Sequence, residues 1–167
     1  MDEKLSLSAQ KFLDVLQSQM LRVEKMKSVQ QFTDYETLDR LIIGVCGGDG
    51  IGPIITAEAQ RVLEYLLADE VKAGKVEFRV IDGLTIENRI ACGKAIPDDV
   101  LAALKECHVI LKGPTTTPRA GYTGPNIESA NVAMRRELDL FANVRPVKVP
   151  EKGIDWTFFR ENTEGSY

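Results

Sequence analysis

The sequence predicts an α/β fold in which a mostly parallel sheet is built from short strands that alternate with helices. Three observations support this fold class. From Leu41 onward, short apolar runs alternate with segments of helical periodicity. A glycine-rich segment at 47–53 follows the first apolar run, and a segment rich in glycine, proline and threonine at 112–125 follows the third. Both segments are expected to be loops at the ends of strands.

Residues 1–40 are expected to form an N-terminal helical extension. Apolar residues recur at spacings of three and four from Leu5 to Val23, and the first glycine of the chain is Gly44. This periodicity predicts an amphipathic helix that ends near Ser28. Its apolar stripe has to pack on the domain behind it or on another subunit. The polar face mixes acidic and basic side chains, which disfavours a membrane-surface helix.

From Leu41 the predicted elements follow in a regular order. They are a strand at 41–46, a helix at about 54–71, a strand at 76–81, a short helix at 86–91, a helix at about 97–106, a strand at 108–111, a helix at 127–138, and strands at 140–144 and 157–159. The apolar spacing in the 54–71 helix predicts an inner face of Ala59, Val62, Leu63, Leu66 and Leu67. In the 97–106 helix, Val100, Leu101 and Leu104 are expected to face inward. A parallel sheet has to be covered on both faces, and these elements cover it only in part. We therefore expect the chain to belong to a longer protein.

Composition excludes several classes of protein. The chain has 167 residues, with 21 Lys and Arg against 25 Asp and Glu and a net charge of −4, so a general nucleic-acid binder is not expected. No apolar run is long enough to span a bilayer, and no secretory signal opens the chain. We therefore expect a cytoplasmic location and no membrane partner.

The cysteines and the histidine give no metal or nucleophile motif. Cys46, Cys92 and Cys107 are too scattered for a disulfide framework and are interpreted as buried thiols. His108, the single histidine, lies in an apolar run and is expected to be a packed residue. A histidine-based zinc site or a Ser-His-Asp triad is poorly supported, and no metal ligand is assigned.

Two interpretations of the glycine-rich segment at 47–53 stay open. Its glycines could let the backbone approach an anion at a helix N-terminus, or they could form a tight structural turn. The order Gly-Asp-Gly-Ile-Gly does not match the Gly-x-Gly-x-x-Gly spacing of dinucleotide-binding turns.

A second group of residues suits a small ligand with several carboxylates. Asn131 and Arg135 lie four residues apart, so they share a helix face, and Ser129 lies near the start of the same helix. Arg145 and Arg160 each follow a predicted strand. Guanidinium groups hold carboxylates bidentately, which favours this interpretation. Solvated surface arginines are the alternative.

Four motifs occur in order along the chain. They are Gly48-Asp49-Gly50-Ile51-Gly52-Pro53, Lys112-Gly113-Pro114-Thr115-Thr116-Thr117-Pro118, Asn143-Val144-Arg145-Pro146 and Arg160-Glu161-Asn162-Thr163-Glu164-Gly165-Ser166-Tyr167. Together they resemble the N-terminal portion of the β-decarboxylating dehydrogenases, the isocitrate and isopropylmalate dehydrogenase family. The resemblance covers residues 41–167 and departs at Ile54, where the family usually has Glu.

The resemblance implies an isopropylmalate-dehydrogenase-like layered fold, incomplete in this chain. Residues 41–139 would be the N-terminal part of the large domain, and 140–167 would begin the small domain. Within the family, isocitrate enzymes have Ser-x-Asn before the first arginine, whereas isopropylmalate enzymes have apolar residues there. Ser129-Ala130-Asn131 therefore implies the isocitrate branch, which forms 2-oxoglutarate in the tricarboxylic acid cycle. The alternatives are an isopropylmalate or homoisocitrate dehydrogenase, and a non-catalytic or regulatory subunit.

The resemblance also implies a role for individual residues. Isocitrate would be bound through its carboxylates by Arg135, Arg145 and Arg160, with Ser129 and Asn131 at the distal carboxylate. Thr117 and Asn162 would lie at the cofactor, and Tyr167 would be the general acid that protonates the enolate carbon. The cofactors would be NAD or NADP and Mg²⁺ or Mn²⁺, and the complete enzyme would be a homodimer. In the family, the metal-binding aspartates and the catalytic lysine follow this portion, so the chain alone is expected to be inactive.

Overall fold

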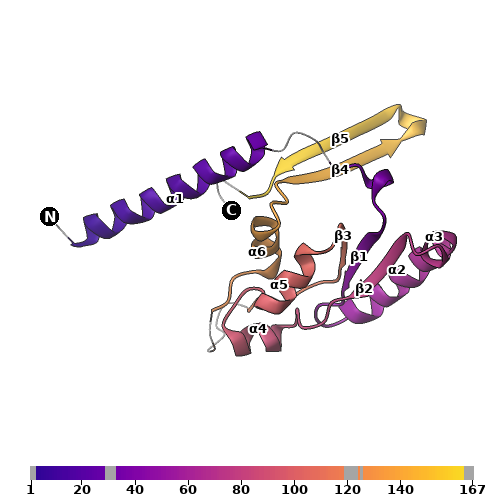
Figure 1. Ribbon diagram of the computed structural model, residues 1–167, viewed down its shortest axis with the longest axis horizontal. Coiled ribbons are helices and arrows are strands. Elements are labelled where there is room, and N and C mark those ends of the chain that lie inside the picture. The colour runs from indigo at the N-terminus through magenta and orange to yellow at the C-terminus, as the bar shows by residue number, and fades with distance from the viewer. Residues whose placement is uncertain (1–2, 29–32, 119–123, 125, 164–167) are drawn as a thin grey trace. The chain divides into compact units, whose positions relative to one another are not determined.

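The computed structural model describes residues 3–28, 33–118, 124 and 126–163 (Figure 1). The chain divides into two compact units, Met1–Leu38 and Asp39–Tyr167. In the first unit, helix α1 spans Glu3–Ser28 and the 3-10 turn η1 spans Tyr35–Thr37. The N-terminal helix predicted to end near Ser28 is therefore confirmed. No helix in the described part of the chain has the length and apolar character needed to cross a membrane.

A three-stranded parallel sheet is the centre of the second unit. Strand β1 (Leu41–Cys46) lies in the middle, between β2 (Val76–Val80) and β3 (Val109–Lys112). Ile43 is in register with Phe78 on one side and with Val109 on the other. This sheet confirms the predicted α/β class with parallel strands.

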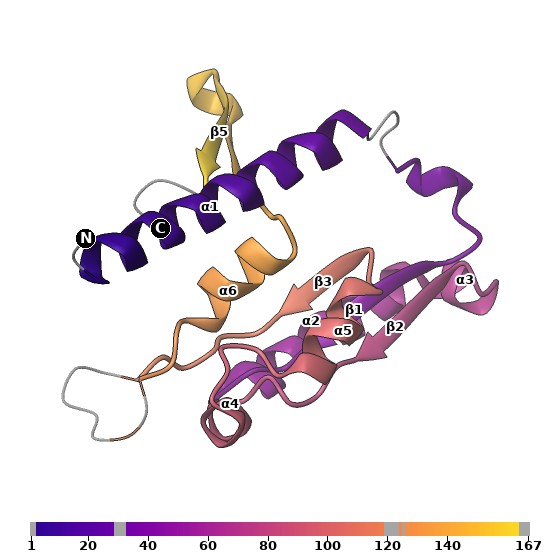
Figure 2. The ribbon, with the colours of Figure 1, turned by 60° about the vertical axis from the view of Figure 1, so that its left-hand side comes forward.

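Helices connect the strands and cover the sheet on both faces. Helices α2 (Gly52–Leu66) and α3 (Ala68–Lys72) join β1 to β2, and helices α4 (Ile86–Cys92) and α5 (Asp98–Lys105) join β2 to β3. Figures 1 and 2 show α2 and α5 on opposite sides of the strands. The β1–β2 connection runs from the middle strand to one edge strand. The β2–β3 connection then crosses over β1 to the other edge strand. Because both crossovers are expected to be right-handed, their helices lie on opposite faces.

The helix predicted over 54–71 differs from the structure in two ways. The chain forms two helices, with a break at Leu67, and the buried face is rotated from the predicted stripe. Val62 is 58% exposed and Leu66 is 66% exposed, so their predicted inward orientation is wrong. Ala59, Leu63 and Leu67 are half-buried, in line with the prediction, and Thr56 is buried although it was not predicted to face inward. The short Thr56 side chain lets the start of α2 approach the sheet closely.

The main core lies between the sheet and helices α5 and α6 (Ala130–Glu137). Val100 and Leu104 are buried as predicted, and Leu101 packs against them. The buried cluster consists of Cys46, Ile81, Leu84, Ile96, Val100, Leu104, Ala130, Ala133 and Met134. Residues from β1 and from α6 thus share one core, which fixes α6 beside the sheet.

The thiols and the histidine follow the prediction only in part. Cys46 is buried and Cys107 is half-buried, but Cys92 is exposed, because it lies on the outer side of α4. His108 is a packed residue, as expected. Its Nδ1 accepts a hydrogen bond from the Ile42 N–H at 3.0 Å, and its backbone N–H donates to the Ile42 carbonyl at 3.0 Å. The side chain thereby extends the β1–β3 pairing by one bond.

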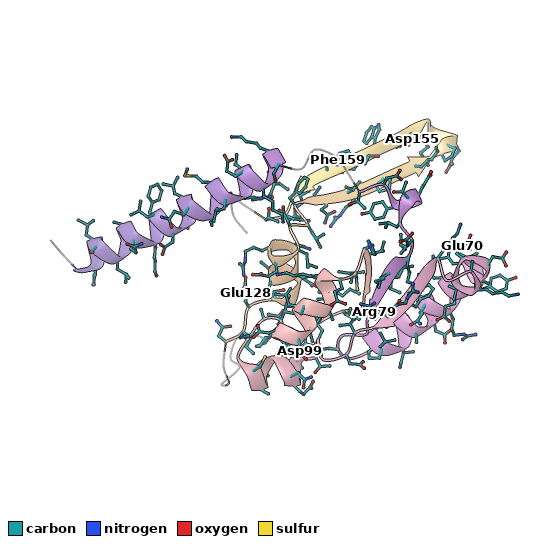
Figure 3. The ribbon with its side chains drawn as sticks, viewed as in Figure 1. Glu70, Arg79, Asp99, Glu128, Asp155 and Phe159 are labelled. Carbon is teal, nitrogen blue, oxygen red and sulfur yellow. The ribbon has the colours of Figure 1, made fainter. Side chains whose placement is uncertain are left out.

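An antiparallel hairpin follows α6. Strands β4 (Ala142–Val149) and β5 (Ile154–Glu161) are joined by the 3-10 turn η2 (Pro150–Lys152), and both are longer than predicted. Charged residues such as Lys148 and Asp155 interrupt the apolar pattern on which the prediction rested. Phe159 is 73% exposed, and Figure 3 shows the side chains that both strands present to their surroundings. The division into a large domain at 41–139 and a small domain from 140 stays a prediction.

Candidate active site

The glycine-rich turn after β1 packs against the loop after β3. A Cβ atom added to Gly48, which has a φ of +72°, would lie 2.1 Å from the Pro114 carbonyl oxygen. A Cβ at Gly113 would lie 2.1 Å from the Gly47 carbonyl oxygen. Glycine is therefore needed here so that two backbones can meet. Of the two interpretations of this turn, the structural one explains these contacts.

Asp49 fixes the same turn through hydrogen bonds to other segments. Its carboxylate is nearly buried, with 9% of the residue exposed. Oδ1 accepts from the Ile86 N–H at 2.8 Å, and Oδ2 accepts from the Thr116 N–H at 2.6 Å. The Asp49 N–H donates to the Pro114 carbonyl at 2.8 Å. Asp49 thus links the turn to the start of α4 and to the Lys112–Pro118 motif.

The sequence interpretation missed Arg89, a fully buried side chain on α4. Nε donates to the Ala95 carbonyl, Nη1 to the Thr116 carbonyl and Nη2 to the Glu128 carbonyl, each at 2.8 Å. Burial lowers the pKa of Arg89, and the charge of Asp49 opposes that shift. A usable signal was present, since Arg89 lies three residues after Ile86 on the face where the helix packs.

Lys112 was noted only as part of a motif, and it too is partly buried. Its Nζ donates to the Gly113 carbonyl at 2.7 Å and to the Thr115 hydroxyl at 3.2 Å. Burial lowers the pKa of Lys112, and the charges of Cys46 and Asp49 oppose this change. The lysine therefore helps to order the loop that contains Thr117.

Three of the predicted substrate residues lie on or beside α6. Ser129 precedes the helix, but its side chain makes no capping hydrogen bond. Asn131 is exposed on the first turn, and Arg135, one turn further, is half-buried. The structure therefore places these side chains along one short helix, as the spacing predicts.

The hairpin brings Arg145 and Arg160 onto one face. Asn143 is directly opposite Arg160 in the register, and Arg145 lies two residues further along β4. Residues two apart on a strand point to the same side, so all three side chains share a face. Arg145 Nε donates to Asn143 Oδ1 at 2.9 Å, which aligns the guanidinium with this face.

The end of α6 and the open end of the hairpin are joined by two backbone hydrogen bonds. The Leu140 N–H donates to the Arg135 carbonyl at 2.7 Å, and the Asn162 N–H donates to the Phe141 carbonyl at 2.9 Å. Asn162 is 6% exposed, and its buried Oδ1 has no hydrogen-bond partner among the described residues. These bonds place Arg135 and Asn162 beside the segment between α6 and β4, whereas Ser129 and Asn131 lie at the other end of α6.

Two predicted site residues are less well placed. Thr117 is exposed on the loop after β3, one residue beyond the Thr116 peptide that Asp49 and Arg89 hold. Tyr167, the predicted general acid, lies outside the described residues.

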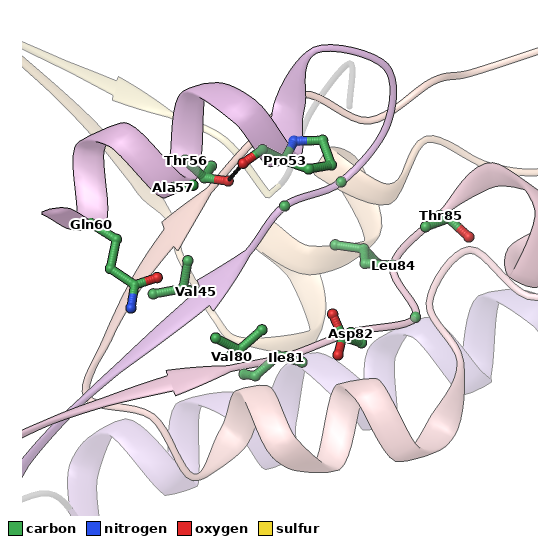
Figure 4. A pocket seen from close by; sticks show the side chains of 13 residues that line it. Val45, Pro53, Thr56, Ala57, Gln60, Val80, Ile81, Asp82, Leu84 and Thr85 are labelled. Carbon is green, nitrogen blue, oxygen red and sulfur yellow. Dashed lines mark hydrogen bonds between the residues drawn. The ribbon is translucent and has the colours of Figure 1, made fainter.

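A pocket of about 270 Å³ lies between α2 and the ends of β1 and β2 (Figure 4). Its polar side chains include Gln60, Asp82 and Thr85, and the Thr56 hydroxyl donates to the Pro53 carbonyl at 3.3 Å beside it. None of the predicted substrate residues in the described part of the chain lines this pocket. It is therefore separate from the candidate site.

A divalent metal such as Mg²⁺ or Mn²⁺ requires several oxygen ligands that converge on one point. Within the described ranges, no cluster of three or more His, Cys, Asp or Glu side chains could hold a metal ion. The residues described here therefore do not fit Mg²⁺ or Mn²⁺ by themselves.

Comparison with known proteins identifies the family. The profile of the isocitrate/isopropylmalate dehydrogenase family matches residues 42–167. An isocitrate dehydrogenase [NADP] of Caldococcus noboribetus is 41% identical over 140 residues, which cover 77% of this chain and 31% of that protein. The isocitrate dehydrogenase [NADP] of Archaeoglobus fulgidus is 42% identical over 139 residues, covering 77% and 32%. That of Haloferax volcanii is 36% identical over 154 residues, covering 86% and 35%.

The chain thus spans about a third of the length of these curated relatives. Two solved structures share its fold. A β-decarboxylating dehydrogenase of Thermococcus kodakarensis, in its apo form, has a TM-score of 0.58 and 33% identity, and the match covers 75% of this chain and 35% of that one. A protein of Thermus thermophilus has a TM-score of 0.52 and 35% identity over 75% of this chain and 25% of that one. The motifs, the layered sheet and these matches agree, and the chain belongs to the isocitrate/isopropylmalate dehydrogenase family.

Proposed function

We propose that this chain is the N-terminal, substrate-binding part of an isocitrate dehydrogenase that converts isocitrate to 2-oxoglutarate with NADP. The main support is the register of the hairpin, in which Arg145 and Arg160 share one face beside Asn143. Two guanidinium groups on one face suit a ligand with several carboxylates. The three relatives described above are all named isocitrate dehydrogenase [NADP], which favours NADP over NAD.

Ser129, Asn131 and Arg135, on or beside α6, would complete recognition of the substrate. Arg135 would hold a carboxylate together with the hairpin arginines. The Ser129 hydroxyl is not used as a helix cap, so it can donate to the distal carboxylate with the Asn131 amide. Hydroxyl and amide donors favour a third carboxylate over the alkyl group of isopropylmalate.

Asn162 and Thr117 would face the cofactor. The buried Oδ1 of Asn162 needs a donor, and the carboxamide N–H of a nicotinamide would supply one. When bound, the nicotinamide accepts the hydride that leaves the hydroxyl-bearing carbon of the substrate. Asn162 would then orient the ring through its carboxamide.

Proton transfer would involve Tyr167. Its phenol would deliver a proton to the carbon that loses carbon dioxide, as a general acid. Because the described residues do not fit Mg²⁺ or Mn²⁺ by themselves, no step is assigned to a metal ion here. A cytoplasmic homodimer that acts in the tricarboxylic acid cycle is part of the same proposal.

The test is a substrate comparison with the complete protein that contains this sequence. We expect NADP reduction with isocitrate in the presence of Mn²⁺, and a much lower kcat/KM with isopropylmalate or with NAD. Preference for isopropylmalate would overturn the substrate assignment. Binding of isocitrate without turnover would instead support the non-catalytic subunit.

A pair of variants tests the hairpin face itself. Arg145→Lys with Arg160→Lys keeps both charges but removes bidentate geometry, so the KM for isocitrate should rise about ten-fold or more. Lys148→Ala is the matched control, because Lys148 lies on the opposite face and pairs with Asp155 at 3.0 Å. A KM that changes equally in both proteins would contradict the proposed role of the arginines.

A further inference from the structure

Arg89 is fully buried, and its guanidinium donates hydrogen bonds to three backbone carbonyls. The three carbonyls belong to Ala95, Thr116 and Glu128, which lie in separate parts of the chain. A buried guanidinium loses its hydration, and the structure offsets that loss with three charge-assisted hydrogen bonds. Arg89 therefore fixes the positions of these carbonyls relative to α4.

Asp49 and Arg89, which carry opposite charges, are linked through the backbone of Thr116. Asp49 accepts from the Thr116 N–H at 2.6 Å, while Arg89 donates to the Thr116 carbonyl at 2.8 Å. One residue thus bridges a buried carboxylate and a buried guanidinium. The N–H of Thr116 donates to the Asp49 carboxylate, and its C=O accepts from the Arg89 guanidinium. These two bonds fix the backbone directly before Thr117.

Glu128 is likewise held through both its backbone carbonyl and its side-chain carboxylate. Its carbonyl accepts from Arg89 Nη2, and its carboxylate accepts from both terminal nitrogens of Arg136 at 3.0 Å each. Ser129 follows directly and begins α6, so its position depends on where Glu128 is held.

We propose that Arg89, together with Asp49, is a positioning residue of the substrate site, which sets the separation between the loop of Thr117 and the start of α6 at Ser129. The inference rests on the proposed function for its activity readout, but not for its structural readout. Arg89 does not touch the substrate. It acts through the peptide of Thr116 and the carbonyl of Glu128, the residues that directly precede Thr117 and Ser129.

The test uses Arg89→Met in the complete protein. Methionine fills much of the same volume but cannot hold the three carbonyls. We expect kcat/KM for isocitrate to fall by about 10²-fold, mainly through a higher KM, the scale expected when site groups are misplaced by about 1 Å. The kcat should change much less, because the arginines and Tyr167 are intact. In Arg89→Ala, added guanidinium salts should restore part of the lost kcat/KM, since the ion can occupy the vacated site.

A control separates positioning from a general loss of stability. Ile43→Ala removes a side chain of β1 that is 6% exposed, lies outside the core cluster that includes α6, and is not among the partners of Thr116 or Glu128. It should lower the thermal midpoint and leave the KM for isocitrate unchanged. If Arg89→Met and Ile43→Ala alter the KM alike, or if Arg89→Met leaves it unchanged, the proposal is wrong.

Hydrogen exchange gives a readout that does not depend on activity. Loss of Arg89 should speed amide exchange at Thr116 and in the first turn of α6, whereas Ile43→Ala should not do so selectively. If the wild-type protein lacks isocitrate turnover, the proposed function fails, and exchange still decides the role of Arg89.

Should Arg89→Met fail to fold, Asp49→Asn provides the second variant. Its amide cannot accept from both the Ile86 and Thr116 N–H groups, so exchange at Thr116 should again rise. Unchanged exchange there would overturn the proposal.

Discussion

At the scale of single residues, Gly48 has no room for a side chain. Its φ is +72°, and an added Cβ would meet the Pro114 carbonyl oxygen at 2.1 Å. Gly48→Ala should lower the free energy of unfolding by about 2–5 kcal/mol, the sum of left-handed strain and a backbone clash. Gly74 is the matched control, because its φ is +74° but nothing lies within 4 Å of an added Cβ. Gly74→Ala should cost only the strain, about 1–2 kcal/mol. Denaturant unfolding of both variants measures the difference, and equal costs would show that the approach of Pro114 is unimportant.

The Cys46 thiol predicts a dependence of stability on alkaline pH. Burial, reinforced by the neighbouring Cys107, raises the pKa of Cys46 to about 11. Between the ordinary thiol pKa and this value, the unfolded chain loses a proton that the folded chain keeps. Stability should therefore fall as pH rises through this window, by about 2–3 kcal/mol in total.

Comparison of the wild-type protein with Cys46→Ala separates the contribution of the Cys46 thiol from that of other groups that titrate at alkaline pH. Cys46→Ala should be less stable at neutral pH, and its unfolding free energy should depend less on pH above the ordinary thiol range. Val45→Ala, which removes buried side-chain volume but no thiol, should keep the wild-type slope. Parallel curves for the wild-type protein and Cys46→Ala would refute the assignment. Chemical denaturation at a series of alkaline pH values provides the measurement.

Ser129 and Asn131 supply the residue-scale test of substrate choice. Replacing both with Leu in the complete enzyme should cost roughly 2–5 kcal/mol of transition-state binding for isocitrate, because donors to a charged carboxylate are lost. Ser129 makes no capping bond, so the change should not weaken the start of α6 through a lost cap. The KM for NADP should stay nearly constant. An unchanged kcat/KM for isocitrate would remove both residues from the site.

The same scale shows which site residues can be predicted from sequence. Arg135, Arg145 and Arg160 stand at the ends of elements in recognisable motifs, so the sequence singles them out. Arg89 was missed because an isolated arginine is usually interpreted as a surface residue. Two of its partners are backbone carbonyls 27 and 39 residues away, and a carbonyl has no side-chain signature. Contacts of this kind become visible only in three dimensions.

At the scale of elements, boundaries were predictable where one face is buried. Strand β1 is buried along most of its length and was predicted at its observed limits, 41–46. The hairpin strands were predicted at 140–144 and 157–159, but they span Ala142–Val149 and Ile154–Glu161. Charged and apolar residues are exposed along both strands, so the apolar alternation that marks a half-buried strand is absent.

At the scale of elements, we also expect the second unit to remain stable when the N-terminal helix is deleted. The core cluster of the second unit contains only residues from Cys46 to Met134, and α1 belongs to the other unit. Removal of residues 1–38 should therefore leave the thermal midpoint of the remaining unit within a few degrees. Circular dichroism and thermal unfolding of both chains provide the test. A large loss of stability would show that the apolar stripe of α1 packs on the second unit.

At the scale of the whole molecule, exposed apolar side chains surround the three-stranded parallel sheet and cover the hairpin. On α2, Val62, Tyr65 and Leu66 are exposed on the outer side of the helix, and on β2 the side chain of Val80 is 60% exposed. The hairpin adds exposed aromatic side chains, including Trp156 and Phe159. Surfaces of this kind usually contact further protein. The family relatives, of which this chain spans about a third, have that additional chain length.

The 167-residue chain by itself is expected to lack dehydrogenase activity. Arg145 and Arg160 belong to a two-stranded hairpin, and isolated two-stranded hairpins are marginally stable in water. The hairpin is anchored at its open end, where Asn162 bonds to Phe141, but most of its residues are exposed on both faces. Little packing therefore surrounds the arginines in this chain, and orientation of the substrate accounts for much of an enzyme's rate acceleration. We expect no reduction of NADP or NAD with isocitrate and Mn²⁺, measured by the ultraviolet absorbance of the reduced nicotinamide. The complete protein, assayed in parallel, should turn over. Activity of the purified chain above a blank would show that its hairpin is ordered without further protein and that the site needs nothing beyond these residues.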